Sequence, residues 1–361
     1  MTLLDRGDRV GDRLVVDRPL GEGAFAEVYR VRHDFLGRQA MKLFKRVTSW
    51  EETHELLGEA RLLTTLGHPN IIRVFDAGTV ETPRGLRGFF TMEYVAGGSL
   101  ERLVAAYRPA VPTAPAVEVT EQIASGLAVA HAHDPPIVHR DLTLANVLVG
   151  YDGDGMRVRI GDFGLAKHVD PFTRRAGAQG TYAFMAPEVL RGGGSSCASD
   201  VWAVGVIGYL LLTNHFPYHD GGPFVPHSTA RFRTRLPPPS HYNDDVDAEL
   251  DRIVLAALEP DPDRRTATAG LLAEALRERR AARAADPTRA RRAPRDDGPE
   301  RVVRPPSDRA RRLVDQALAL SRVPGDLYRA ADLLEEAVNL SPTLRHAHLH
   351  RLTLWRRGVT M

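Results

Sequence analysis

The residues best suited to chemistry lie in two short segments near the middle of this 361-residue chain. The first runs from His139 to Asn146 and places the carboxylate of Asp141 five residues before the carboxamide of Asn146. The second is Asp162-Phe163-Gly164, which supplies another carboxylate and a glycine that gives the following loop conformational freedom. A carboxylate can accept the proton of a hydroxyl, and a carboxylate with a carboxamide suits Mg²⁺ held against phosphate oxygens. The two segments therefore predict phosphoryl transfer to a hydroxyl group.

A glycine-rich segment near the N-terminus is a candidate phosphate-binding loop. The run Gly21-Glu22-Gly23-Ala24-Phe25-Ala26-Glu27-Val28 lies between two β-rich stretches. Two glycines separated by one residue let a hairpin backbone bring its N–H groups close to an anion. Taken alone, the segment leaves a plain hairpin turn as the alternative.

A lysine and a glutamate complete this group of charged candidates. The chain has only three lysines, at 42, 45 and 167, while all its other cationic side chains are arginines. Lys42 is therefore a candidate for chemistry that needs a compact ammonium, with a solvated strand edge as the alternative. Glu59, nine residues before His68 and on a predicted helix, is its expected ion-pair partner. A solvated helix face is the alternative for Glu59.

These residues need strands and helices to position them. Residues 9 to 96 predict short strands at 10–20, 27–32, 38–44, 71–77 and 89–95, with one helix at 51–66. From Leu100 onward the apolar spacing becomes helical, most clearly at 116–133, 199–213 and 247–258. The segments at 139–146 and 162–164 lie between these helices, on loops and short strands.

The composition is that of an ordinary soluble globular protein, with 43% hydrophobic and 26% charged residues. A formal net charge of +2 argues against a dedicated nucleic-acid binder. The single cysteine, Cys197, excludes an intrachain disulfide and fits a reducing, cytoplasmic location. The longest apolar run, residues 201–213, is too short to span a bilayer, and the N-terminus has no secretory signal pattern.

Taken in order, these motifs make the chain resemble the eukaryotic-like serine/threonine protein kinases of bacteria, over residues from about 12 to 276. The resemblance implies an α+β, bilobal protein-kinase fold, with a β-rich N-lobe containing one helix (9–95) and a helical C-lobe (96–280). It also implies ATP and Mg²⁺ as cofactors, and transfer of the γ-phosphate to Ser/Thr hydroxyls of protein substrates.

The resemblance also assigns roles to individual residues. It makes Asp141 the catalytic base, with Asn146 and Asp162 as magnesium ligands. Lys42, Glu59, Asn146 and Thr181 join Asp141 in the catalytic set. The nucleotide contacts that it implies come from the glycine loop, the next strands and the hinge: Gly21, Glu22, Gly23, Ala24, Phe25, Val28, Ala40, Lys42, Glu93, Val95 and Leu148.

Other family positions concern support and specificity. Asp200 resembles the buried aspartate that braces the catalytic loop, and Glu188 is expected to pair with Arg265. The Gly180-Thr181 step resembles serine/threonine kinases rather than tyrosine kinases. Thr173, between Asp162 and Glu188, is the predicted autophosphorylation site, with a solvated loop residue as the alternative.

Two positions depart from the family pattern. Ala26 replaces the third glycine of the phosphate loop, where a small residue is still expected to be tolerated. Thr143 replaces the lysine that usually stands two residues after the base, so one positive charge near the γ-phosphate is missing. A slower enzyme is therefore expected. The alternative function is a nucleotide-binding pseudokinase scaffold that acts through its C-terminal helices.

The C-terminal part changes character twice. Residues 281–306 predict an Arg/Pro-rich linker with almost no large apolar side chains. Residues 307–358 resume helical periodicity and weakly resemble a tetratricopeptide repeat through the spacing of Gly325, Ala330, Leu334, Ala337 and Pro342. Because one repeat buries its own face poorly, a protein partner, docking on the kinase, or a truncated array is expected. A plain helical tail is the alternative.

Overall fold

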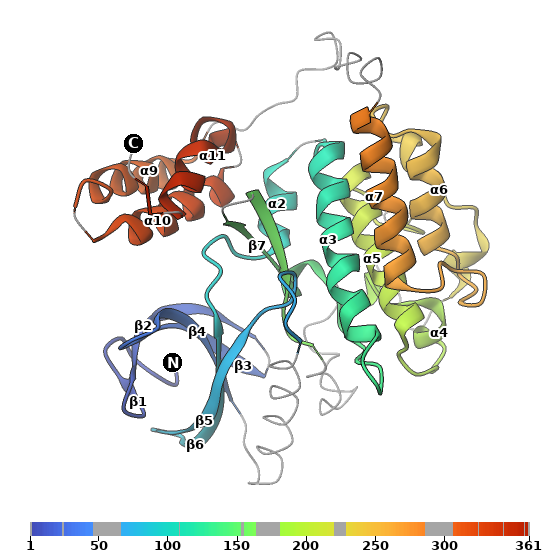
Figure 1. Cartoon of the computed structure of the whole chain (residues 1–361). Helices are drawn as coiled ribbons and strands as arrows, with labels where there is room; N and C mark the ends of the chain where they lie inside the picture. Colours follow the sequence, from blue (N-terminus) through green and yellow to red (C-terminus); the bar gives the residue numbers. More distant parts are fainter. Residues whose placement is uncertain are drawn as a thin grey trace. The chain divides into compact units, whose positions relative to one another are not determined.

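The computed structural model describes residues 2–23, 25–45, 66–107, 109–152, 155–163, 181–219, 229–285, 306–323, 325–341, 343–356 and 358–359. The chain falls into two units, one of Met1–Val95 with Phe163–Gly177, the other of Ala96–Asp162 with Ala178–Met361. The first is rich in strands and the second in helices, as the sequence predicts. Figure 1 shows the elements of both units.

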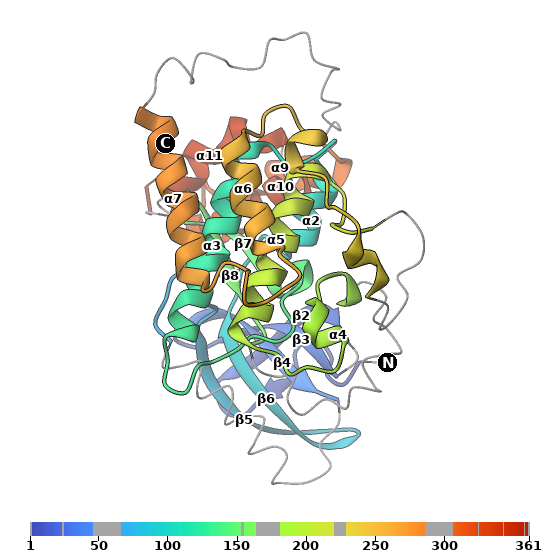
Figure 2. The same ribbon diagram turned by 90° about the vertical axis from the view of Figure 1, so that its right-hand side faces the viewer.

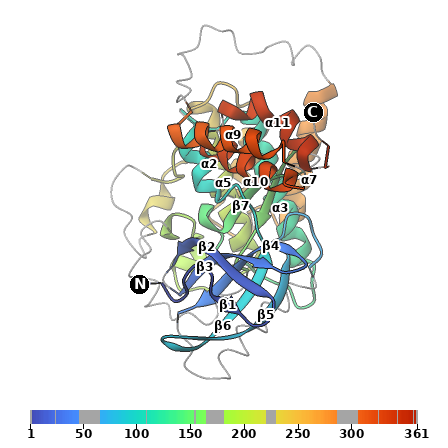
Figure 3. The ribbon, with the colours of Figure 1, turned by 90° about the vertical axis from the view of Figure 1, so that its left-hand side faces the viewer.

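A six-stranded antiparallel sheet forms the first unit, in the order β1-β2-β3-β4-β6-β5 (Figure 3). The strands are β1 (Arg9–Val10), β2 (Leu14–Glu22), β3 (Ala26–His33), β4 (Gly37–Phe44), β5 (Val74–Thr82) and β6 (Gly85–Glu93). Alternate side chains along β2, β3 and β4 point into one core that includes Val16, Tyr29, Val31 and Met41.

Three predicted strands differ from the structure in their bounds. The stretch predicted at 10–20 is divided between β1 and β2, and the strand predicted at 89–95 is β6, which begins at Gly85. The strand expected at 71–77 begins at Val74 and continues to Thr82, because a tight turn pairs Thr82 with Gly85 and lets polar residues join the ladder. The predicted helix at 51–66 lies outside the described residues, apart from Leu66.

A helical bundle forms the larger part of the second unit (Figure 2). Its helices are α2 (Leu100–Ala106), α3 (Thr113–His131), α4 (Pro187–Leu190), α5 (Cys197–Thr213), α6 (Ala248–Ala257) and α7 (Ala269–Ala285). Helix α5 is buried along nearly its whole length between α3, α6 and α7. Gly208 permits this, since a Cβ there would lie 3.2 Å from the Thr120 side chain of α3. The three clearest predicted helices correspond to α3, α5 and α6.

A short hairpin carries the chemistry-bearing loops of this unit. It consists of β7 (Val147–Asp152) and β8 (Gly155–Ile160), and it pairs Val147 with Ile160. Helix α3 fixes β8 through Gln122, whose side chain donates to the Met156 carbonyl at 3.0 Å and accepts from the Val158 N–H at 2.7 Å. The hairpin therefore brings the residue before β7 next to the residue after β8.

Three further helices end the chain: α9 (Asp308–Leu320), α10 (Leu327–Leu340) and α11 (Thr343–Arg356). Helix α7 continues to Ala285, five residues into the segment predicted as a linker. The extension is held because Arg279 and Arg283 both reach the Asp247 carboxylate. Within the described part of the chain, no helix combines the length and apolarity needed to cross a bilayer.

Candidate active site

Asp200 of α5 holds the backbone of the loop that contains Asp141. Its buried carboxylate accepts hydrogen bonds from the N–H groups of His139 at 2.7 Å and Arg140 at 3.0 Å. The His131 Nε2 atom, at the end of α3, lies 2.9 Å from the same carboxylate. These contacts hold Arg140 in the left-handed region, at φ +70°, a conformation that persists only where neighbours impose it.

The imidazole of His139 links this loop to the segment before Asp162. The Asp141 N–H donates to its Nδ1 atom at 3.3 Å, and its Nε2 atom lies 2.8 Å from the Gly161 carbonyl oxygen. Since a carbonyl oxygen only accepts, the ring proton lies on Nε2. The ring is fully buried, so it fixes the backbone on both sides without water.

Asn146 and Asp162 are brought together by the β7–β8 hairpin. The Gly161 N–H donates to the Asn146 carbonyl oxygen at 2.8 Å, and the next residue, Asp162, has φ +58°. The carboxamide nitrogen of Asn146 donates to the Asp141 carbonyl oxygen at 2.7 Å. Its carboxamide oxygen accepts no hydrogen bond from the described residues, which fits a cation ligand.

Thr143 lies beside Asp141 on the wall of a small pocket. The same pocket is lined by Phe184, Met185 and Val189 from the segment that leads into α4 and from α4 itself. Thr143 also precedes the 3-10 turn of Leu144–Asn146, whose last N–H donates to the Thr143 carbonyl at 3.2 Å. The residue that departs from the family pattern therefore lies next to the predicted base.

The first unit holds the predicted phosphate-loop and lysine residues on three neighbouring strands. Gly21 faces Val28 across β2 and β3, and the Gly23 N–H donates to the Ala26 carbonyl at 2.8 Å, which closes the turn. Lys42 on β4 lies opposite Val28 on β3. Phe25 at the tip is partly exposed.

Two other predicted nucleotide residues of this unit have clear positions. Ala40 is buried on β4, opposite Met92 of β6. The Glu22 side chain pairs with Lys45, and this hydrogen bond and charge lower the pKa of Glu22.

The predicted hinge residues follow β6. Glu93 ends that strand, and its N–H donates to the Arg73 carbonyl at 2.8 Å. Val95 follows two residues after the end of β6, and no hydrogen bond from the described part of the chain involves its backbone. In the second unit, half-buried Leu148 lies on β7.

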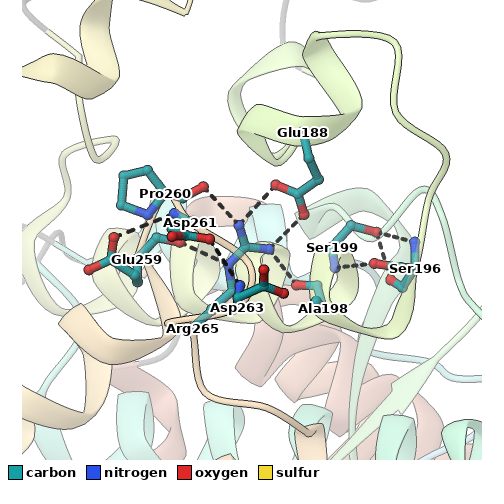
Figure 4. A network of polar contacts seen from close by, with 9 residues as sticks. All are labelled: Glu188, Ser196, Ala198, Ser199, Glu259, Pro260, Asp261, Asp263 and Arg265. Carbon is teal, nitrogen blue, oxygen red and sulfur yellow. Dashed lines mark hydrogen bonds and ion pairs between the residues drawn. The ribbon is translucent and has the colours of Figure 1, made fainter.

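The predicted Glu188–Arg265 pair forms, and Figure 4 shows its surroundings. The Arg265 guanidinium donates to both carboxylate oxygens, at 2.7 and 2.9 Å, and also to the carbonyls of Ala198 at 2.7 Å and Glu259 at 2.9 Å. The Arg265 side chain is fully buried and lies over the Trp202 ring. This pair ties the segment at 186–190 to the helical bundle.

Some predicted residues lie outside this description, and one supporting residue was not predicted. Ala24, Glu59 and Thr173 are not among the described residues, and for Thr181 only the backbone, in a 3-10 turn, is described. His131, which reaches Asp200 from α3, belongs to no sequence motif. Only its position as the basic residue in the last turn of α3 could have drawn attention to it.

Comparison with known proteins agrees with this geometry. The protein kinase domain family matches residues 14–276, nearly three quarters of the chain. The chain belongs to the protein kinase family. Enzymes of this kind use ATP with Mg²⁺, as the catalytic motifs predict. The match ends at residue 276, so the family accounts for neither the end of α7 nor α9–α11.

The similar curated proteins are bacterial serine/threonine-protein kinases. PrkC of Bacillus subtilis is 31% identical over 268 residues, which cover 73% of this chain and 40% of PrkC. PknB of Mycolicibacterium smegmatis is 33% identical over 267 residues, covering 72% of this chain and 42% of PknB. The chain therefore spans about two fifths of the length of these relatives.

Among solved structures, the kinase domain of PknI from Mycobacterium tuberculosis is similar, with a TM-score of 0.56 and 27% sequence identity. The similarity covers 77% of this chain and all of that domain. The bilobal protein-kinase fold predicted from the sequence is therefore confirmed.

Proposed function

We propose that this chain is an active protein kinase that transfers the γ-phosphate of ATP to serine and threonine hydroxyls of proteins. The observation that carries the proposal is the buried His139 ring, which ties the backbone of Asp141 to that of Gly161, next to Asp162. This contact sets a proton acceptor and a metal-binding carboxylate in one rigid frame, as phosphoryl transfer requires.

Each group then has a chemical task. Asp141 orients the substrate hydroxyl and accepts its proton during transfer. Lys42 and the N–H groups of the glycine loop bind the phosphates, with Glu59 as the ion-pair partner of Lys42. Ala40, Val28 and Leu148 enclose adenine, and the backbone at Glu93 and Val95 hydrogen-bonds its edge. Thr181 hydrogen-bonds Asp141 and favours serine/threonine specificity.

Asn146 and Asp162 are the residues that would hold magnesium. Bound there, the cation neutralises charge on the phosphate oxygens. The carboxamide orientation fixed by the Asp141 carbonyl leaves an oxygen for this purpose. The left-handed φ of Asp162 marks a backbone held in a strained form, as functional loops often are.

A non-transferring scaffold is the rival function, and Thr143 is the residue that favours it. The presence of Asp141, Asn146, Asp162 and Lys42 together argues for the enzyme. Incubation with γ-labelled ATP followed by phosphoamino-acid analysis tests the proposal. Label on serine or threonine is expected. Label confined to tyrosine, or no label, contradicts it.

Phosphorylation of Thr173 is proposed as the activating event. The Arg140 Nη1 atom is buried and has no hydrogen-bond partner among the described residues, so an anion nearby would stabilise it. Mass spectrometry of active protein should find phosphate on Thr173. Unmodified Thr173 in fully active protein would remove this part of the account.

The remaining proposals concern the rest of the chain. Residues 9–280 are proposed as the kinase domain, the segment between the end of α7 at Ala285 and residue 306 as the Arg/Pro-rich linker, and 307–358 as a tetratricopeptide-like segment. The single cysteine supports a cytoplasmic location. Protein substrates with serine or threonine are proposed, and nucleic acid is not expected as a partner. The helical segment could also take a protein partner.

A further inference from the structure

Two of the three C-terminal helices, α10 and α11, lie against the rest of this unit, and α9 packs on α10. Helix α10 contacts both α2 and β7, and α11 contacts β7 (Figures 1 and 3). All these elements belong to the same unit of the chain. The buried side chains of α10 and α11 include Leu334, Val338, Leu352 and Trp355. The apolar face that one helical repeat cannot bury alone is thus covered within this chain.

A buried carboxylate lies at the centre of this contact. Glu335 of α10 is 2% exposed, and it accepts a hydrogen bond from the Tyr151 N–H of β7 at 2.7 Å. Arg356 of α11 pairs with Glu335 and also with Asp332, at 2.8 Å. A buried charge is stable only when its partners are in place, so the carboxylate depends on both helices and on β7.

A second contact lies one helical turn further along α10. The Asn339 side chain is buried, and its nitrogen donates to the Glu335 carbonyl at 2.9 Å. It packs against Gly97, where an added Cβ would overlap both Asn339 and the Val149 carbonyl oxygen. Gly97 therefore lets α10 approach this segment and β7 at backbone distance.

These two contacts hold the two chain segments that border the adenine end of the proposed nucleotide site. Gly97 comes two residues after Val95, a predicted hinge residue, and Tyr151 comes three residues after Leu148. The segments are themselves joined, because the Val149 N–H donates to the Gly98 carbonyl at 2.9 Å. A shift of α10 would therefore displace both the Gly97-Gly98 segment and β7.

We propose that α9–α11 act as an internal brace of the ATP site, with Glu335 and Asn339 as positioning residues for β7 and for Gly97-Gly98. The proposal rests on the proposed kinase function. It gives the C-terminal segment a role within this chain that does not require a partner protein. By reciprocity, ATP binding strengthens the docking of the helices.

Full-length variants test the brace, because a loss of bracing should raise the KM for ATP and leave kcat nearly unchanged. Glu335→Leu removes the acceptor of the Tyr151 N–H and should raise the KM for ATP about fivefold or more, with kcat at saturating ATP within about twofold. Glu335→Gln keeps an oxygen that can accept the Tyr151 N–H, and Arg356 retains its ion pair with Asp332. The KM of this variant for ATP should therefore stay near that of the wild type. Asn339→Ala should shift KM in the same direction as Glu335→Leu.

Glu336→Leu is the matched control, because the neighbouring Glu336 pairs with Arg309 of α9 inside the helical segment. An unchanged KM in Glu335→Leu, an equal rise in Glu336→Leu, or a loss of kcat alone would overturn the brace. If the wild type transfers no phosphate, the kinase proposal fails by itself. The dissociation constant for ATP then tests the same variants, with the same order expected.

Discussion

Thr143 is the single residue with the largest expected effect on rate. It lies beside Asp141 in the same pocket, where the family usually carries a lysine. A cation there would stabilise charge that develops on the transferred phosphate, and one such contact is worth roughly 2–4 kcal/mol. Thr143→Lys is therefore expected to raise kcat, by about thirtyfold to a thousandfold.

The matched control is Thr143→Gln, which has similar length and no charge. Steady-state rates at saturating ATP should rise for lysine and stay near the wild-type value for glutamine. An equal rise in both variants would show that size rather than charge limits the rate. No rise in Thr143→Lys would mean that this site has another source of positive charge.

Residue types and spacing point to the candidate catalytic and metal-binding residues, and the structure adds the contacts that hold their backbone in place. Asp141, Asn146 and Asp162 follow from motifs, and the braces by Asp200 and Arg265 were confirmed by their hydrogen bonds. The bridging role of His139 was not predicted, because it depends on which ring nitrogen faces which backbone group. Such a detail comes from three-dimensional placement and not from residue type.

At the scale of elements, the Glu188–Arg265 pair anchors α4 to the helical bundle. Glu188→Ala would leave the fully buried Arg265 without its counter-charge, which destabilises by about 3 kcal/mol. For a chain of this size the melting temperature should fall by about 5 to 10 °C. Calorimetry measures this directly. Arg264→Ala, at an arginine that is 73% exposed, is the control and should change little.

Asp247 predicts a dependence of stability on pH. Burial works to raise the pKa of its carboxyl, but the hydrogen bonds from Arg279 and the Leu250 N–H, together with the charges of Arg279 and Arg283, outweigh burial and lower the pKa below the ordinary 3.8. The folded state therefore gains from the ionised form, and this gain is present above pH 3.8 and lost as the pH falls through the lowered value.

Asp247→Asn tests this, since asparagine can still cap α6 through the Leu250 N–H. Urea unfolding at pH 7 should show the variant less stable by about 1 to 2 kcal/mol, allowing for solvent at this partly exposed pair. The difference should shrink below pH 3.8. A difference that stays constant down to pH 3 would contradict the assigned cause.

The elements themselves were predicted to different degrees. Helices α3, α5 and α6 follow from apolar spacing, whereas β5 was misplaced because polar residues extend it through a hairpin turn. The continuation of α7 to Ala285 was missed, since its support is the distant Asp247. The composition of that segment indicates that it cannot form a core of its own. Composition does not reveal the ion pair that joins Arg283 of α7 to Asp247 at the start of α6.

At the scale of the whole molecule, the sequence offers docking of the C-terminal helices on the kinase as one of several possibilities, and the contacts that favour it come from the structure. Tyr151 and Glu335 are 184 residues apart, and no motif connects them. The sequence leaves open a partner, docking on the kinase, or a truncated array. The contacts of Glu335 and Asn339 favour docking within the chain.

Limited trypsin digestion tests this docking without any activity measurement. The arginines at 289, 291 and 292 lie in the predicted linker and should be cut early. The fragment that carries α9–α11 should then stay with the kinase domain on native gel filtration. In Glu335→Leu the fragments should separate more readily. Immediate separation of the wild-type fragments would count against a docked segment.

The central claim is that Asp141 accepts the proton during phosphate transfer by this chain. The most direct measurement is transfer of labelled γ-phosphate by the wild type and by Asp141→Asn, with ATP binding measured in parallel. Label is expected from the wild type, with a loss of at least about a hundredfold in Asp141→Asn and similar ATP binding by both. Equal transfer by both proteins, or ATP binding without any transfer by the wild type, would contradict this claim.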